Sequence, residues 1–440
     1  MRQTRAGAAM RGCLVWRAMG SNSPTKPYPS LATLVRVFVP FALGYFLSYL
    51  YRTINAVIAP NLAADVDLNA ADLGLLTSAY FLTFAFFQLP LGVLLDRFGP
   101  RRTEAVLLLF AATGAFVFAN AHSTAGLMVG RALVGVGVSA CLMAAFKAFV
   151  LWFPSRRLPL INGLQMAAGG LGALAATAPV EAALQVTTWR GVFIGLGICT
   201  LAVAGLIFLI VPERKRDVPV TSFSEQVRGI GQVFTSPVFW RIAPWTVMAQ
   251  AAFLSILGLW VGPWLRDVAG LERGAVADYL AFIAMAMIAG FVFMGAVAER
   301  LSRRGIQPMT VAGIGMVVSL LMQAMLMLGW RNMALPLWML FGFFGTTSII
   351  PYAVLSQSFP APLVGRVITG LNLLVFTTAF ACQWGIGVLI NLWPTTSTGG
   401  YPPPAYQAAL AMMLALQVAG LIWYLVSAGR RPVRRRSDMA

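Results

Sequence analysis

Residues 92–102 read Gly92-Val-Leu-Leu-Asp-Arg-Phe-Gly-Pro-Arg-Arg102 and follow an apolar stretch long enough to cross a membrane. A related stretch, Gly295-Ala-Val-Ala-Glu-Arg-Leu-Ser-Arg-Arg-Gly305, begins 203 residues later and also follows an apolar stretch. The pair Phe153-Pro154 recurs 206 residues later as Phe359-Pro360. Motifs that recur at nearly the same separation indicate that the second half of the chain repeats the first.

The composition places the chain in a membrane. Of its 440 residues 59% are hydrophobic and 10% are charged, and the mean hydropathy is +0.78. A soluble domain carries about 25% charged residues. Apolar stretches of about 20 residues, the length of a transmembrane helix, recur along the chain with short polar connections between them. We therefore predict an all-α membrane protein without a soluble domain.

The apolar stretches predict twelve transmembrane helices in two six-helix pseudo-repeats. The predicted spans are 34–59, 73–95, 103–121, 124–152, 158–183, 190–211, 239–264, 276–298, 308–329, 336–358, 366–392 and 405–428. They divide the chain into a disordered N-terminal tail (1–33), an N-terminal half (34–211), a linker (212–238), a C-terminal half (239–428) and a basic tail (429–440).

Basic residues are distributed unevenly between the two sides. Twelve spans put both termini on one side, and the tails, connections and span ends on that side hold 25 Lys and Arg. The other side holds four: Arg190, Arg266, Arg273 and Arg331. Because basic residues are retained on the cytoplasmic face, this asymmetry predicts a bacterial inner-membrane protein with both termini in the cytoplasm. The net charge of +18 is then a topology signal and does not indicate a nucleic-acid partner.

The linker 212–238 carries helix signals of its own. Ser222 and Glu225 have capping-box spacing, and apolar residues follow Phe223 at i+4, i+7 and i+11. One interpretation is an amphipathic helix along the inner membrane surface. The other is a linker that packs its apolar side against the rest of the protein.

The stretch 92–102 resembles the loop signature of the major facilitator superfamily, with Pro100 as a departure from it. Gly130-Arg131-Ala-Leu-Val-Gly135-Val-Gly137 is similar to a second element of that superfamily. The resemblance runs from about residue 34 to 428 and implies the major facilitator fold, in which spans one, four, seven and ten line a central cavity. It implies a gate at the loop residues Gly92, Asp96, Arg97, Arg101, Glu299 and Arg300. The alternative is that these loops only fix the topology.

Four ionisable residues are predicted to lie well inside the spans, away from the span ends: Arg52, Arg131, Lys147 and Glu181. Each costs at least about 2.5–3.5 kcal/mol to insert, so each is a functional candidate. Lys147 lies near the predicted cytoplasmic rim, where snorkelling explains it. Arg131 and Glu181 are candidates for coupling. For Glu181, an ion pair with Arg131 and simple exposure at the rim remain alternatives.

Arg52 lies near the middle of the first span. It shares one predicted helix face with Tyr45, Ser48, Tyr49 and Asn55. A polar face of this kind indicates contact with substrate or water, and the alternative is a buried ion pair or an arginine that snorkels to the membrane surface. We therefore predict that Arg52, Asn55, Tyr49 and Tyr45 bind substrate.

The first span also resembles that of the organophosphate:phosphate antiporters and the anion:cation symporters. Phosphate-ester carriers have a second arginine in the middle of span seven, where this chain has Gln250. This difference argues against a doubly charged phosphate ester. The resemblance to the major facilitator fold, whose cavity is lined by spans one, four, seven and ten, adds Gln250, Trp260 and Ser348 to the predicted substrate site.

Together these features predict a secondary active transporter that moves a small organic anion by alternating access. Two alternatives stay open: a proton-coupled drug or siderophore exporter, and a membrane sensor that binds ligand without transporting it. The sequence has no His, Cys or carboxylate cluster that would point to an enzyme, a metal site or a cofactor. The expected partners are the lipid bilayer and one small-molecule substrate, and we expect a monomer.

The charge asymmetry makes a direct prediction about topology. In intact cells, single cysteines placed within 393–404 should react with a membrane-impermeant maleimide. Cysteines placed within 92–102, 212–238 or 429–440 should react only in inverted vesicles. Labelling of 393–404 from the cytoplasmic side alone would contradict the topology.

Overall fold

The computed structural model describes residues 31–153, 158–213, 222–360, 363–397 and 399–429, and the regular elements in these ranges are all helices. The predicted tails 1–33 and 429–440 lie almost wholly outside the described residues. The helices before the linker are α2 (Leu31–Thr53), α3 (Asn55–Val66), α4 (Ala70–Asn120), α5 (Thr124–Val138), α6 (Cys141–Trp152), α7 (Leu158–Ala175), α8 (Ala178–Leu184) and α9 (Trp189–Ile210).

The linker contains α10 (Phe223–Phe234). The elements that follow it are α11 (Pro237–Ser255), the π-helix η2 (Ile256–Trp260), α12 (Val261–Asp267), α13 (Arg273–Ser302), α14 (Pro308–Met327), the 3-10 helix η3 (Arg331–Met333), α15 (Ala334–Gly345), the 3-10 helix η4 (Thr346–Ile349), α16 (Ile350–Gln357), α17 (Val364–Ile390) and α18 (Pro403–Gly429).

These helices make twelve membrane spans. Among the described residues ten helices are long and apolar enough to cross a bilayer, and the bent pair α2 and α3 makes an eleventh. One of the ten, α4, has 51 residues, about 76 Å at 1.5 Å per residue, while a bilayer core is about 30 Å thick. It is divided at Gly99, whose φ of 79° favours glycine. The two parts of α4 are separate spans, which confirms the predicted fold class.

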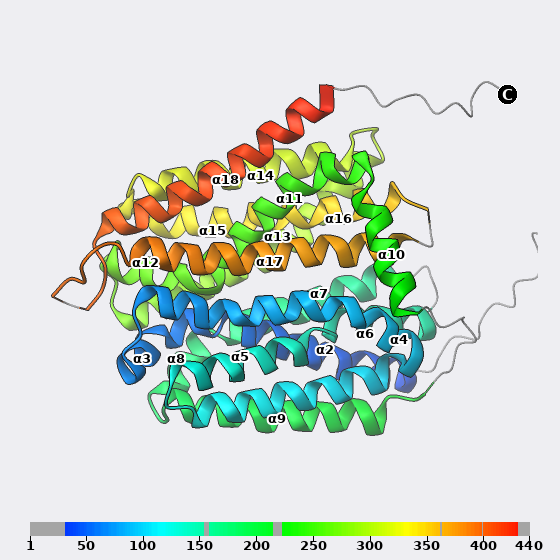
Figure 1. The fold of residues 1–440 in the computed structure, drawn as a ribbon, viewed down its shortest axis with the longest axis horizontal. Coiled ribbons are helices and arrows are strands. Elements are labelled where there is room, and N and C mark those ends of the chain that lie inside the picture. Colours follow the sequence, from blue (N-terminus) through cyan, green and yellow to red (C-terminus); the bar gives the residue numbers. More distant parts are fainter. Residues whose placement is uncertain (1–30, 154–157, 214–221, 361–362, 398, 430–440) are drawn as a thin grey trace, which may run out of the picture.

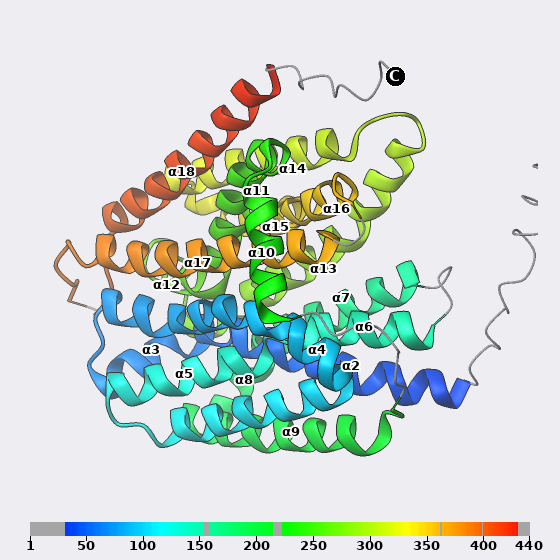
Figure 2. The same ribbon diagram turned by 45° about the vertical axis from the view of Figure 1, so that its right-hand side comes forward.

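The spans lie side by side in two groups (Figure 1). Helices α2–α9 form one group and α11–α18 the other, and Figure 2 shows the same division after a 45° turn. Helix α10 crosses one end of the molecule and joins the groups. We term this end, which also carries the turns at 99 and 305, the basic end. The opposite end, which carries the connection 391–402, is termed the distal end.

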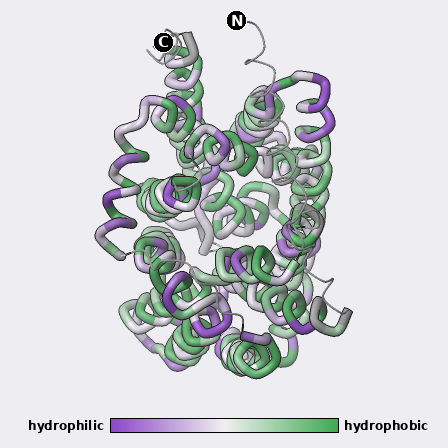
Figure 3. The backbone as a smooth tube through the Cα atoms, turned by 90° about the vertical axis from the view of Figure 1, so that its right-hand side faces the viewer, coloured by the Kyte–Doolittle hydropathy of each residue, from purple (hydrophilic) through white to green (hydrophobic). Residues whose placement is uncertain are grey.

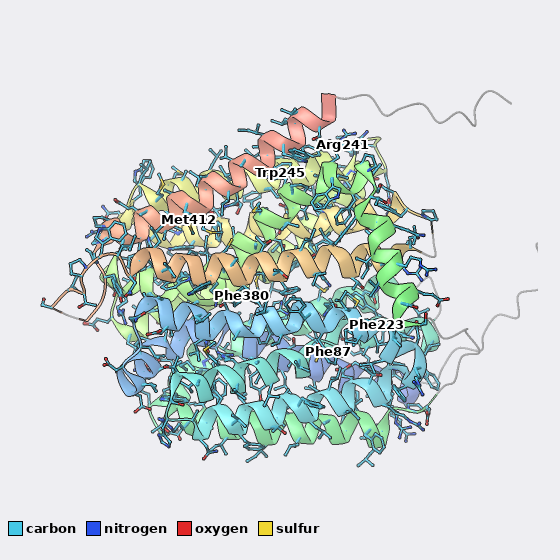
Figure 4. All side chains as sticks on the ribbon, viewed as in Figure 1. Phe87, Phe223, Arg241, Trp245, Phe380 and Met412 are labelled. Atoms are coloured by element: carbon cyan, nitrogen blue, oxygen red, sulfur yellow. The ribbon has the colours of Figure 1, made fainter. Side chains whose placement is uncertain are left out.

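The outer flanks of both groups are apolar. Figure 3, viewed from the basic end, shows mainly hydrophobic helices, and Figure 4 shows side chains projecting from their flanks. Large apolar side chains remain exposed there, among them Leu209, Ile314 and Leu425. An apolar perimeter of this extent fits contact with lipid rather than water.

Helix α10 begins with the predicted capping box. The Ser222 hydroxyl accepts from the Glu225 backbone N–H, and the Ser222 backbone N–H donates to the Glu225 carboxylate, which lowers the pKa of that carboxyl. Along the helix Ile230 and Val233 are buried, whereas Phe223 is half exposed. The apolar side of α10 thus packs in part against the two groups, as the second interpretation of the linker predicts.

Candidate functional site

A cavity of about 720 Å³ lies between the two groups. Its walls come from α2, α4, α5, α6 and α7 on one side and from α11, α13, η4, α16 and α17 on the other. Arg52 and Gln250 lie deep in it. At the basic end Gly163 and Glu299 border it, so the cavity extends from the middle of the molecule toward that end.

Aromatic rings surround the Arg52 side chain, which is 9% exposed. Its guanidinium carbon lies 4.6 Å from the ring centre of Tyr49, 5.4 Å from that of Phe376, 5.5 Å from that of Phe84 and 5.9 Å from that of Tyr80. The Arg52 Nε has no hydrogen-bond partner among the described residues, and no described carboxylate pairs with this side chain.

The rings compensate the Arg52 charge only in part. Each of the four rings offers a cation about 0.5–2 kcal/mol against a desolvation cost of several kcal/mol, but none of them carries the negative charge that would neutralise the guanidinium. The cavity therefore presents a positive charge that can still accept a negative partner. An anion held there would contact the planar fork of N–H donors that arginine offers.

Arg131 supports the backbone beside Arg52. Helix α2 ends at Thr53 and α3 continues at a bend of 48°, so the last carbonyls of α2 need other donors. The Arg131 Nη1 donates to the Tyr51 carbonyl at 2.8 Å, and its guanidinium carbon lies 5.2 Å and 5.6 Å from the ring centres of Phe118 and Phe193. Arg131 does not line the cavity, and we consider it a positioning residue for Arg52.

The structure brings part of the predicted substrate site together. Tyr45, Tyr49, Arg52 and Gln250 all line the cavity. Ser348 lies just behind it, with its hydroxyl bonded to the Gln250 side chain.

Two other predicted residues point elsewhere. Asn55 donates to the Thr77 hydroxyl at 2.8 Å, because the bend after Thr53 takes Asn55 off the face that Arg52 occupies. The prediction of one continuous face through Asn55 is therefore wrong. Trp260 is buried and donates to the Gln383 carbonyl at 3.1 Å, outside this cavity.

Several polar residues of the cavity were not predicted from the sequence. They are Ser48, Gln88, Ser139, Tyr352 and Asn372. Ser48 was placed on the face of Arg52 but was not assigned to the site. The others are polar residues within apolar spans, and this was the sequence feature that could have identified them as cavity residues.

Glu104 is a fully buried acid that was also missed. It lies on α4 just beyond the kink, and neither carboxyl oxygen has a hydrogen-bond partner among the described residues. It packs against Gly44 of α2, with the Cys141 thiol beside it. It is the second residue of the predicted span 103–121, and this position at the span end is why it was not counted among the intramembrane charges. The predicted intramembrane charges, three basic residues and one acidic residue, favoured an anionic substrate. Glu104 adds a second acid, so the support for an anion now rests on Arg52.

At the distal end the two groups are in contact. The Arg273 Nε of α13 lies 2.6 Å from a carboxylate oxygen of Glu181 in α8, and Arg273 also donates to the Asn61 side chain at 2.7 Å. Glu181 is thus paired across the groups with Arg273 rather than with Arg131. Gly387 approaches the Ala70 carbonyl so closely that a Cβ would lie 2.3 Å from that oxygen. These contacts close the distal end.

The predicted gate residues lie at the basic end. The Asp96 carboxylate lies 2.5 Å from the Lys147 Nζ, so Lys147 has an ionic partner there in addition to its position at the rim. The Arg101 Nε donates to the Phe208 carbonyl at 2.8 Å, and Glu299 pairs with Arg303 at 2.6 Å.

The remaining gate residues lie close by. Gly92 and Asp96 border a second hollow of about 270 Å³ together with Arg366 of the other group. The Arg97 guanidinium lies over the Phe98 ring, and Arg300 is in the last turn of α13.

Within the described ranges no three His, Cys, Asp or Glu side chains lie close enough together to hold a metal ion. The polar groups that converge are instead those around Arg52. The arrangement can therefore bind a small charged molecule in a cavity that is closed at the distal end.

Comparison with known proteins places these observations in a family. The family model described as Major Facilitator Superfamily matches residues 41–381. The chain is 24% identical to a probable sulfoacetate transporter, SauU, of Cupriavidus necator, over 60% of this chain and 64% of that protein. It is 26% identical to a hexuronate transporter of Escherichia coli, over 54% of this chain and 58% of that protein. The matches thus span less than two thirds of either relative.

Solved structures share the fold at low sequence identity. A bacterial homologue of the human lysosomal transporter Spinster, in an inward-facing and unoccupied conformation, matches with a TM-score of 0.68 at 18% identity, over 91% of this chain and 96% of that one. The nucleoside transporter NupG matches with a TM-score of 0.71 at 11% identity, over 89% of this chain and 99% of that one.

Proposed function

This chain belongs to the Major Facilitator Superfamily, and on that premise we propose that it is a secondary active transporter that carries a small organic anion by alternating access. The observation that supports the anion is Arg52, a buried charge in the cavity between the two groups that no described carboxylate neutralises. Two relatives are named as transporters of sulfoacetate and hexuronate. Both compounds are organic anions, which supports the same substrate class.

The direction of opening follows from the charge distribution. The basic end then faces the cytoplasm, because Lys and Arg are retained on that side. With the cavity extending to the basic end and the distal end closed, the described conformation is inward-facing. Transport then requires the basic end to close and the distal contacts to separate.

Glu181 is the residue that couples this change to an ion. Its pair with Arg273 bridges the two groups at the distal end, and the Glu181 side chain is 10% exposed while that of Arg273 is 44% exposed. Because this ion pair joins the two groups, the distal contacts can separate only when the Glu181–Arg273 pair breaks.

The gate at the basic end uses Asp96 and Lys147 on one group and Arg366 on the other. These side chains border one hollow, so a small relative motion of the groups changes their distances. The linker helix α10 packs against the same region, since Arg366 lies over Gly229. Asp96 thus lies between Lys147 of its own group and Arg366 of the other group. The contact between the two groups at Asp96 forms and breaks in each transport cycle.

We predict that Arg52→Gln abolishes transport and that Arg52→Lys weakens anion binding by at least about tenfold. A charge-assisted hydrogen bond contributes about 1.5–3 kcal/mol, and Lys keeps the charge but loses the fork. Uptake into proteoliposomes and ligand-dependent melting temperatures measure these effects. Arg331→Gln, at an exposed arginine of the distal end, is the matched control and should behave like wild type. Wild-type affinity in folded Arg52→Gln protein would rule out Arg52 as the anchor, and binding without flux in wild type would indicate a sensor.

We predict that Asp96→Asn lowers transport about tenfold while abundance in the membrane stays near normal. The substitution keeps the shape of the side chain but removes the charge that Lys147 faces. Lys147→Met should give a similar loss, whereas Asp278→Asn at an exposed distal position should not. Quantitative immunoblots measure the abundance in the membrane, and initial uptake rates measure transport. If Asp96→Asn protein is instead missing from the membrane, Asp96 is structural and the gate assignment fails.

A further inference from the structure

The walls of the cavity differ from what a sugar acid or a doubly charged anion requires. From them we infer that the transported anion carries a single negative charge on an apolar body, as an aryl or alkyl monocarboxylate or monosulfonate does. This inference rests on the proposed function, because it names the substrate class of the same site. It departs from both curated relatives, since a hexuronate is rich in hydroxyl groups and sulfoacetate carries two anionic groups.

The first observation is that the cavity offers one positive charge. Among the described residues that line it, Arg52 is the only basic side chain and Glu299 the only acidic one. Glu299 lies at the mouth and is paired with Arg303. Lys147 borders the neighbouring hollow and is paired with Asp96. A second negative charge on the substrate would be desolvated without a partner, which is strongly unfavourable.

The second observation concerns the surface around that charge. Beside Arg52 the rings of Phe84 and Phe376 lie 4.3 Å apart, and they form an apolar wall next to the guanidinium. Further toward the basic end the wall continues with Phe146, Phe291 and Ile368. Apolar groups gain from leaving water against such a surface, whereas hydroxyl groups lose their water partners and find no replacement.

The third observation is that several polar side chains of the cavity already have partners. The Gln250 side chain is bonded to the Ser348 hydroxyl. The Gln88 Nε2 donates to the Ser139 carbonyl at 3.3 Å, and the Tyr45 hydroxyl contacts the Met166 sulfur at 3.7 Å. The other polar side chains of the cavity, Ser48, Tyr49, Tyr352 and Asn372, remain for a ligand. A single polar head at Arg52 can be satisfied there, whereas hydroxyl groups along the rest of the substrate would lie against the apolar wall.

The size of the cavity is consistent with this class. At about 720 Å³ it lies within the range of roughly 300–1,000 Å³ that is typical of small-molecule sites. A ring or a short alkyl chain leaves room for the walls to close around it. An anion of only two carbons would leave most of the apolar wall uncovered.

The test compares matched probes that differ in one property each. Purified full-length protein is titrated at constant pH and ionic strength with phenylacetate, cyclohexanecarboxylate, phenylmalonate, galacturonate, sulfoacetate and 2-phenylethanol, and the melting temperature is recorded. We expect phenylacetate and cyclohexanecarboxylate to bind at least tenfold more tightly than the other four. Arg52→Gln should abolish the effect of both.

A variant of the wall tests the apolar part separately. Phe376→Leu should weaken phenylacetate binding at least fivefold and leave galacturonate binding unchanged. If that protein does not fold, Phe84→Leu on the facing ring serves in its place.

The outcomes separate this inference from the proposed function. Tighter binding of galacturonate, sulfoacetate or phenylmalonate, lost in Arg52→Gln, would overturn the apolar monoanion and leave an organic-anion transporter standing. Binding of 2-phenylethanol alone, or of none of the probes, would overturn both. Binding of phenylacetate that survives in Arg52→Gln would also overturn both, because partition into apolar surface would then explain it.

Discussion

The structure depends on one positive charge that the fold buries without neutralising. Arg52 lies in the cavity between the two groups, against four aromatic rings, and its Nε has no protein partner among the described residues. The rings recover only a part of the cost of burial. A charge that remains unfavourable in the empty protein becomes favourable when an anion arrives, and this difference is the free energy that binding can use.

Other features of the first group maintain that arrangement. The bend after Thr53 ends α2 directly beside Arg52, and Arg131 holds the Tyr51 carbonyl at that point. The two arginines therefore have different roles although both are buried. The cavity extends toward the basic end, while the Glu181–Arg273 pair closes the other end. In the function proposed above, a substrate at Arg52 lies where motion of either group changes its surroundings, as alternating access requires.

The sequence was sufficient for the features that local pattern determines. The spans followed from apolar length and the cap of α10 from Ser222 and Glu225. The insertion cost singled out Arg52, which lines the cavity. Features that depend on contacts between distant segments could not be predicted. The pairing of Glu181 with Arg273 joins residues from the two groups. Asn55 does not share the face of Arg52, because helical periodicity assumes a straight helix and the chain bends after Thr53. Glu104 was not identified as a buried acid, because the burial of a side chain next to a loop depends on neighbouring helices such as α2.

The most direct test is to compare the thermal unfolding of ligand-free Arg52→Gln and Arg131→Gln proteins with that of wild type. Removing an uncompensated buried charge should leave the melting temperature of Arg52→Gln at or above that of wild type. Arg131→Gln should melt lower by several degrees, since it loses the bond to Tyr51 and the contacts with two rings. If Arg52→Gln is destabilised as much as Arg131→Gln, the protein itself compensates the Arg52 charge. That result would contradict the claim that the Arg52 charge is left uncompensated for a substrate anion.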